Sequence, residues 1–269
     1  MLLLIGEDLR PLRQAQSKTM TRIVGWTYPG GKGGVGVYQN IINCMPQHDF
    51  YIEAFLGAGA VFRHKKPARG NLGIDLDEKV IHTWAASGIP SLEVIHGDAF
   101  EILSNWRWQG YEHRRTLIYC DPPYLKHTRS SRRPVYRCDL TSDEAHTRLL
   151  QILLRLPCMV MLSGYRSALY ESMIGHWRQA HFPTVNRAGK PTVETIWMNF
   201  PTPSALHDYR YLGRGFRERE RIKRRRERWK ARLLRMPLLE RQAVLLALHE
   251  VSSFSELHPE HFERNSPPN

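Results

Sequence analysis

The sequence predicts an α/β fold with a mainly parallel sheet. Between about residues 40 and 200, short apolar segments without strict alternation recur, and longer stretches of helical periodicity separate several of them. Strands that are buried on both faces consist of such apolar segments, and alternating strands and helices favour a parallel sheet covered on both faces. In such sheets, ligands bind beyond the carboxyl ends of the strands.

Six segments carry the strand pattern, because each is short, rich in apolar residues and bounded by turn residues or by a helical pattern. They are 50–56, 71–76, 92–97, 116–121, 158–164 and 194–200. The clearest helix is 143–156, which has Ser142 at its N-cap position and acids in its first turn. These segments define the predicted α/β domain.

The composition changes after about residue 205. A charged helical pattern covers 217–235, Pro237 follows, and a second helical pattern occupies 238–250. We therefore predict an α/β domain at 20–205 and a basic helical C-terminal extension at 206–260. The remaining ends are expected to be flexible, namely 1–19 and 261–269.

The net charge of +13 at pH 7 is concentrated in two places. Residues 210–235 contain 13 Lys and Arg against 3 Glu. The second cluster follows residue 124 and has no acid within it; it consists of Lys126, Arg129, Arg132, Arg133 and Arg137. Two basic clusters favour a polyanionic partner, although a solvated helix face and a solvated loop would have the same composition.

The sequence also bears on the compartment. Its first residues hold only a short apolar run, closed by Glu7 and Asp8, which does not fit a secretory signal, and no other segment approaches a membrane span. The four cysteines are widely spaced and show no metal-ligand pairing. We expect a cytoplasmic protein with reduced thiols, no membrane partner and no metal site.

The first candidate site is a glycine turn after the first expected strand. Gly57 and Gly59 permit positive φ and close approach of a ligand, although a tight packing turn would use the same residues. Asp75 ends the next strand, where an acid can accept hydrogen bonds from ribose hydroxyls. Asp98 ends another, where it would serve either as an adenine contact or as a helix cap. With no third glycine and no phosphate-binding lysine pattern, neither a dinucleotide nor a triphosphate fits.

The second candidate site is the segment Asp-Pro-Pro-Tyr at 121–124. Proline donates no backbone hydrogen bond and restricts the residue before it to extended conformations, so strand pairing has to stop at Asp121. The segment therefore lies at the end of a strand, where ligands of parallel sheets bind. The alternative is a strand-terminating turn followed by a core tyrosine.

Five motifs occur in a fixed order, namely YPGGK at 28–32, FLGAG at 55–59, GIDLD at 73–77, GDAF at 97–100 and DPPY at 121–124. This combination, over roughly residues 26–200, resembles the DNA adenine N6-methyltransferases of the Dam-like, D12 class. The resemblance implies a Rossmann-like class I methyltransferase fold, S-adenosylmethionine as methyl donor and adenine N6 in duplex DNA as acceptor. It places the following residues at the cofactor: Tyr28, Lys32, Phe55, Gly57, Gly59, Asp75, Asp98 and Asp121.

The DPPY segment suits an exocyclic amino group, which is a poor nucleophile because its lone pair is delocalised into the ring. The Asp121 carboxylate and the Pro122 carbonyl are two acceptors for its hydrogens, and the Tyr124 ring can stack on an extruded base. The sulfonium methyl is already activated, so positioning is the main task and neither a metal nor a covalent enzyme intermediate is needed.

One feature departs from the family. Dam-like enzymes usually carry a target-recognition insert before DPPY, but only twenty-two residues separate Asp98 from Asp121. We therefore assign DNA binding to the cluster of Lys126, Arg129, Arg132, Arg133 and Arg137, with phosphate contacts from the arginine-rich helix. The sequence leaves the target sequence and the oligomeric state open. Two alternatives also stay open: methylation of RNA adenine N6 or DNA cytosine N4, and a non-catalytic nucleic-acid binder.

Overall fold

The computed structural model describes residues 31–34, 36–87, 89, 91–106, 115–128, 140, 142–185 and 189–257. The chain divides into two compact units, Met1–Asp208 and Tyr209–Asn269. The predicted boundary between residues 205 and 206 lies close to this division. The ends predicted to be flexible, 1–19 and 261–269, lie outside the described residues.

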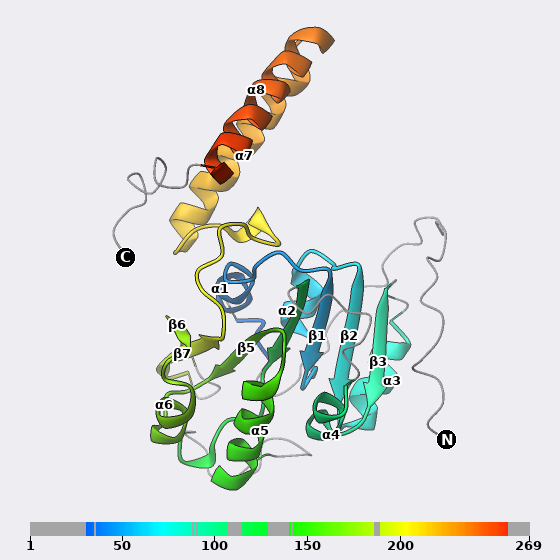
Figure 1. Cartoon of the computed structure of the whole chain (residues 1–269), viewed down its shortest axis with the longest axis vertical. Helices are drawn as coiled ribbons and strands as arrows, with labels where there is room; N and C mark the ends of the chain where they lie inside the picture. Colours follow the sequence, from blue (N-terminus) through cyan, green and yellow to red (C-terminus); the bar gives the residue numbers. More distant parts are fainter. Residues whose placement is uncertain are drawn as a thin grey trace. The chain divides into compact units, whose positions relative to one another are not determined.

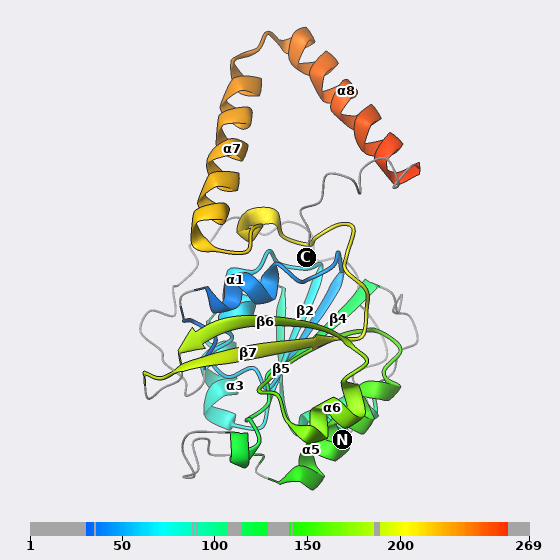
Figure 2. The ribbon, with the colours of Figure 1, turned by 90° about the vertical axis from the view of Figure 1, so that its left-hand side faces the viewer.

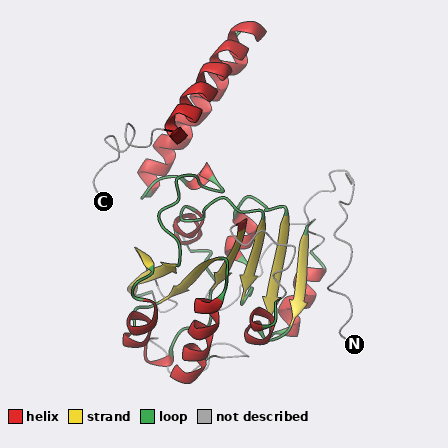
Figure 3. Ribbon diagram, in the orientation of Figure 1, coloured by secondary structure: helices red, strands yellow, loops and turns green. Residues whose placement is uncertain are grey.

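The first unit is built on a seven-stranded sheet of order β3-β2-β1-β4-β5-β7-β6 (Figures 1 and 3). Strands β1 to β5 are parallel, whereas β7 is antiparallel to both β5 and β6. The strands are β1 (Phe50–Ala54), β2 (Gly70–Asp75), β3 (Leu92–His96), β4 (Thr116–Cys120), β5 (Met159–Gly164), β6 (Arg178–Val185) and β7 (Pro191–Met198). This order confirms the predicted Rossmann-like class I methyltransferase fold, and it reverses between β1 and β4, where ligands bind in such sheets.

Helices cover both faces of the sheet, as predicted (Figures 1 and 2). On one face, α4 (Ala99–Ser104), α5 (Asp143–Arg155) and α6 (Ala168–Ile174) share a core with alternate residues of β1, β2, β4 and β5. On the other face lie α1 (Val37–Ile42), α2 (Ala60–His64) and α3 (Glu78–Ala85), and Phe62 of α2 packs against the rings of Tyr51 and Trp84. Helix α5 is capped as predicted, because the Ser142 hydroxyl accepts a hydrogen bond from the Ala145 amide at 3.2 Å.

Strand alternation decides which side chains reach the ligand-binding end of the sheet. In β1, Ile52 and Ala54 point into the core with α4 to α6, so Tyr51 and Glu53 lie on the opposite face. Strand β4 follows the same alternation and ends at Cys120, directly before Asp121, as the prolines predicted. Because Ala54 pairs with Cys120, the glycine turn and the DPPY segment begin side by side.

The second unit consists mainly of α7 (Phe216–Arg235) and α8 (Leu238–Leu257), separated at Met236 and Pro237 as the sequence predicted. No residue of α7 is buried, which agrees with its high charge. Within the described part of the chain, no helix is long and apolar enough to cross a membrane.

Candidate active site

The glycine turn after β1 adopts a conformation that few residues tolerate. Phe55, Gly57 and Gly59 have φ of 62°, 47° and 53°, in the left-handed region, which confirms the positive φ expected for the two glycines. For Phe55 such a conformation costs of order 1–3 kcal/mol. Its ring packs edge-on against Phe100 of α4, with the centroids 6.4 Å apart, so tertiary packing helps to hold the strained residue.

Asp75 accepts two backbone hydrogen bonds, one of which holds this turn. The Gly57 amide donates to Asp75 Oδ2 and the Asp77 amide donates to Oδ1, each at 2.8 Å. Burial raises the pKa of the Asp75 carboxyl, and these backbone hydrogen bonds oppose the rise. A carboxylate has about four lone-pair positions, so acceptor capacity remains beyond these two bonds. The role of Asp75 at a ribose stays a prediction.

Trp84 of α3 contacts both glycines of the turn. Its indole N–H donates to the Gly57 carbonyl at 2.8 Å. A Cβ atom at Gly59 would lie 2.3 Å from Cζ2 of this ring, so only glycine fits. Asp98 has a local role as well, because it caps α4 by accepting a hydrogen bond from the Phe100 amide at 2.8 Å. The cap that the sequence offered as an alternative is therefore present, and an adenine contact stays a prediction.

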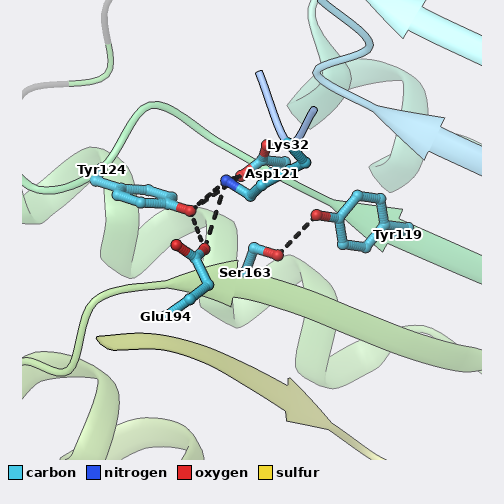
Figure 4. Close-up of polar contacts among 6 residues, drawn as sticks. All are labelled: Lys32, Tyr119, Asp121, Tyr124, Ser163 and Glu194. Atoms are coloured by element: carbon cyan, nitrogen blue, oxygen red, sulfur yellow. Dashed lines mark hydrogen bonds and ion pairs between the residues drawn. The ribbon is translucent and has the colours of Figure 1, made fainter. Parts of the chain in front are cut away.

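The DPPY segment meets a lysine and a second acid at the end of the sheet. Figure 4 shows Lys32, Asp121, Tyr124 and Glu194 converging from before α1, from after β4 and from β7. Lys32 Nζ lies 2.6 Å from Asp121 Oδ1 and 3.4 Å from Glu194 Oε1, and it donates to the Tyr124 hydroxyl. The Tyr124 hydroxyl in turn contacts both acids: it donates to Glu194 Oε1, and it lies 3.3 Å from Asp121 Oδ1.

These four residues form an electrostatic unit with one cation and two acids. The side chains of Lys32, Asp121 and Glu194 are 8%, 17% and 4% exposed. Burial raises the pKa of both acids, and the neighbouring Lys32 ammonium lowers it in part. Burial and the two carboxylates raise the pKa of Tyr124 well above its usual range, so its hydroxyl keeps its hydrogen. When both acids are ionised, the cluster carries a surplus of one negative charge, which favours a cationic ligand.

A further buried acid lies on the same face of the sheet. Glu53 of β1 accepts a hydrogen bond from the Tyr51 hydroxyl at 2.8 Å, and burial raises its pKa to about 8. On the neighbouring β4, the Tyr119 hydroxyl is 2.7 Å from Ser163 Oγ of β5 (Figure 4). These hydrogen bonds pair polar side chains that are buried in the sheet, where an unpaired polar group would destabilise the fold.

Sequence reasoning missed two residues of this site. The sequence places Glu194 only in an expected strand. A carboxylate next to an otherwise apolar segment could have indicated a functional residue. Tyr165, just after β5, packs against the Tyr124 ring with centroids 4.7 Å apart and planes at 69°. No motif pointed to Tyr165, because its role depends on β4 and β5 being neighbours.

The structure places several predicted residues at the carboxyl ends of β1, β2, β3 and β4, and their roles there stay predictions. Lys32, Asp121 and Tyr124 are in direct contact. Pro122, the residue after Asp121, is buried. Lys126 is exposed at the start of a short 3-10 helix, Lys126–Thr128. Five predicted residues lie outside the described residues, namely Tyr28, Arg129, Arg132, Arg133 and Arg137.

No protein-family model matches the chain, and no curated protein matches its sequence. Among solved structures, it is similar to the 23S rRNA methyltransferase ErmE, at 12% identity over 70% of this chain and 72% of that chain, with a TM-score of 0.39. A dimethyladenosine transferase from Plasmodium falciparum gives 13% identity over 60% of each chain and a TM-score of 0.37. Precorrin 8W decarboxylase from Methanobacterium thermoautotrophicum gives 11% identity over 64% of this chain and 92% of that chain, with a TM-score of 0.40. Similarities this weak carry no conclusion about ligand or reaction.

Proposed function

We propose that the chain is an S-adenosylmethionine-dependent methyltransferase that modifies adenine N6 in duplex DNA. The observation that carries the proposal is the placement of the Asp121 carboxylate. It follows β4 at the point where the strand order reverses, beside the glycine turn of β1 and next to the Tyr124 ring. A buried acceptor and an aromatic ring adjoining a cofactor turn are what methylation of an extruded base requires.

The residues at the turn fit the proposed cofactor. The left-handed Gly57 and Gly59 bring backbone close to a ligand, and Asp75 retains acceptor positions for ribose hydroxyls. The surplus negative charge around Lys32 complements a ligand that carries a sulfonium and an amino group. We also assign Tyr28, Phe55, Asp98 and Asp121 to this ligand. When bound, it supplies an activated methyl group.

The acceptor chemistry rests on the chain's own polar groups. The Asp121 carboxylate accepts one hydrogen of the target amino group and the Pro122 carbonyl accepts the other, which draws the nitrogen towards tetrahedral geometry. Positive charge develops on that nitrogen during transfer, and the buried carboxylate of Asp121 stabilises it because it is fixed in advance. The Tyr124 ring, held edge-on by Tyr165, supplies a stacking surface for the base.

Two basic regions would bind the nucleic acid. Lys126 lies two residues after the DPPY segment, with Arg129, Arg132, Arg133 and Arg137 after it, so we assign these residues to contacts around the target base. The exposed helix α7 carries the largest basic cluster and suits phosphate contacts that do not depend on sequence.

The test is to incubate the purified chain with S-adenosylmethionine carrying a labelled methyl group and with duplex DNA or RNA, and then to identify the labelled nucleoside after digestion. N6-methyladenine from DNA, lost in Asp121→Ala, is the expected product. N6-methyladenine from RNA only, or N4-methylcytosine, would replace the proposed acceptor. Cofactor binding without transfer to any nucleic acid would contradict the enzyme function.

A further inference from the structure

Glu194 contacts both Lys32 and Tyr124 in the polar cluster, yet the proposed chemistry assigns it no role. It lies in β7 and is buried, and its Oε1 atom accepts the hydrogen of the Tyr124 hydroxyl. The same hydroxyl is 3.3 Å from Asp121 Oδ1. A phenol has one hydrogen to donate, so two carboxylates compete for it.

The position of Lys32 explains why the Tyr124 hydroxyl donates its hydrogen to Glu194 and not to Asp121. The lysine ammonium is 2.6 Å from Asp121 Oδ1 but 3.4 Å from Glu194 Oε1, so it neutralises Asp121 more fully. Glu194 is then the more strongly negative acceptor, and the Tyr124 hydroxyl lies closer to it than to Asp121. The hydrogen of Tyr124 is therefore drawn away from the DPPY carboxylate.

We propose that Glu194 is a positioning residue that takes the hydrogen of Tyr124 and so keeps the Asp121 carboxylate available to the amino group of the target base. The inference rests on the proposed function. Without Glu194, the Tyr124 hydroxyl turns to Asp121, to which it is already close, and occupies an acceptor position that the target amino group needs. Asp121 then holds both Lys32 and Tyr124 and is a weaker acceptor for the substrate.

This role predicts a specific pattern of mutant rates. Loss of one charge-assisted acceptor contact in the transition state slows methyl transfer by roughly 10- to 100-fold, so Glu194→Ala should reduce kcat by that factor. Tyr124→Phe alone should change kcat only a few-fold, because the ring remains. In the double variant Glu194→Ala with Tyr124→Phe, the misdirected hydrogen is gone, so the rate should return to that of Tyr124→Phe. Glu194→Gln should slow transfer less than Glu194→Ala, because its amide oxygen still accepts the Tyr124 hydrogen but, without the charge, competes less well with the Asp121 carboxylate.

A merely structural role for Glu194 predicts the opposite pattern. If its burial only supports β7, removal of the Tyr124 hydroxyl adds a second defect, and the double variant is no faster than Glu194→Ala. Single-turnover methyl transfer at saturating S-adenosylmethionine and duplex DNA separates the two cases, and thermal melting and cofactor titration check that each variant folds and binds. Where the alanine cavity unfolds the chain, Glu194→Met removes the acceptor while filling the volume.

The outcomes are distinguishable. Recovery of the rate in the double variant supports the inference. An active wild type whose double variant stays as slow as Glu194→Ala, or a fully active Glu194→Ala variant, overturns it and leaves the proposed function in place. A wild type that binds the cofactor but transfers no methyl group overturns the proposed function, and the inference with it.

Discussion

Gly59→Ala should destabilise the protein by about 2–5 kcal/mol, which combines two separate costs. The residue has φ +53°, a left-handed conformation that costs an L-residue roughly 1–2 kcal/mol. Its new Cβ would also lie 2.3 Å and 2.9 Å from Cζ2 and Cη2 of Trp84, and overpacking of this kind costs roughly 1–3 kcal/mol. Trp84 cannot withdraw cheaply, because it is 1% exposed and its N–H holds the Gly57 carbonyl at 2.8 Å.

Gly189→Ala is the matched control. Gly189 has φ +76°, and a Cβ there would meet no atom within 4 Å, so this variant reports the backbone cost alone. Urea unfolding of the two variants should therefore differ by about 1–3 kcal/mol, the cost of the clash with Trp84. Gly59→Ala should also weaken S-adenosylmethionine binding, which Gly189→Ala should leave unchanged. Equal unfolding free energies for the two variants would refute the reasoning about Trp84.

Three further predictions follow from the charges. Lys32→Met removes the cation that lowers the pKa of Asp121, so the acid limb of the methyl-transfer rate should move to higher pH, and an unmoved limb would argue against this pairing. Glu53 has a pKa near 8, against 4.5 in the unfolded chain, so the folded state binds more protons in that window and the wild-type free energy of unfolding falls as pH rises. Glu53→Gln should remove this fall in urea unfolding, and an identical pH dependence in both proteins would contradict it. Replacing Arg224, Arg225 and Arg226 of α7 with Gln should reduce the salt slope of DNA binding by about 0.9 per lost phosphate contact, whereas an unchanged slope would mark α7 as a solvated face.

The central strands were predictable because their environment leaves a direct trace in the sequence. Strands β1, β2, β4 and β5 are buried on both faces, and they appear as apolar segments closed by turn residues or acids. Strand β6, Arg178–Val185, was missed because it lies at the edge of the sheet, contains Pro183 and has one buried residue, Phe182. An edge strand needs no apolar pattern, so its position depends on pairing with β7.

The candidate site was predictable only in part, for a related reason. Asp121 and the glycine turn follow predicted strands, and local backbone chemistry places them at the strand ends. Lys32 lies 89 positions before Asp121, and Glu194 lies in a strand that enters the sheet by an antiparallel pairing. Their contacts depend on the tertiary fold, which no local pattern encodes. The hydrogen bond from the Gly57 amide to Asp75 depends in the same way on the exact path of the turn.

The most direct test of the central claim, that Asp121 receives the target amino group and Tyr124 receives the base, is single-turnover methylation by Asp121→Ala and Tyr124→Ala. Each variant is assayed on two duplexes, one with the target adenine paired to thymine and one with it mismatched. A mismatch lowers the cost of extruding the base, which is a few kcal/mol, so it should partly restore the rate of Tyr124→Ala. It should not restore Asp121→Ala, whose defect lies in the chemical step. Equal rescue of both variants, or an active Asp121→Ala enzyme, would contradict the account.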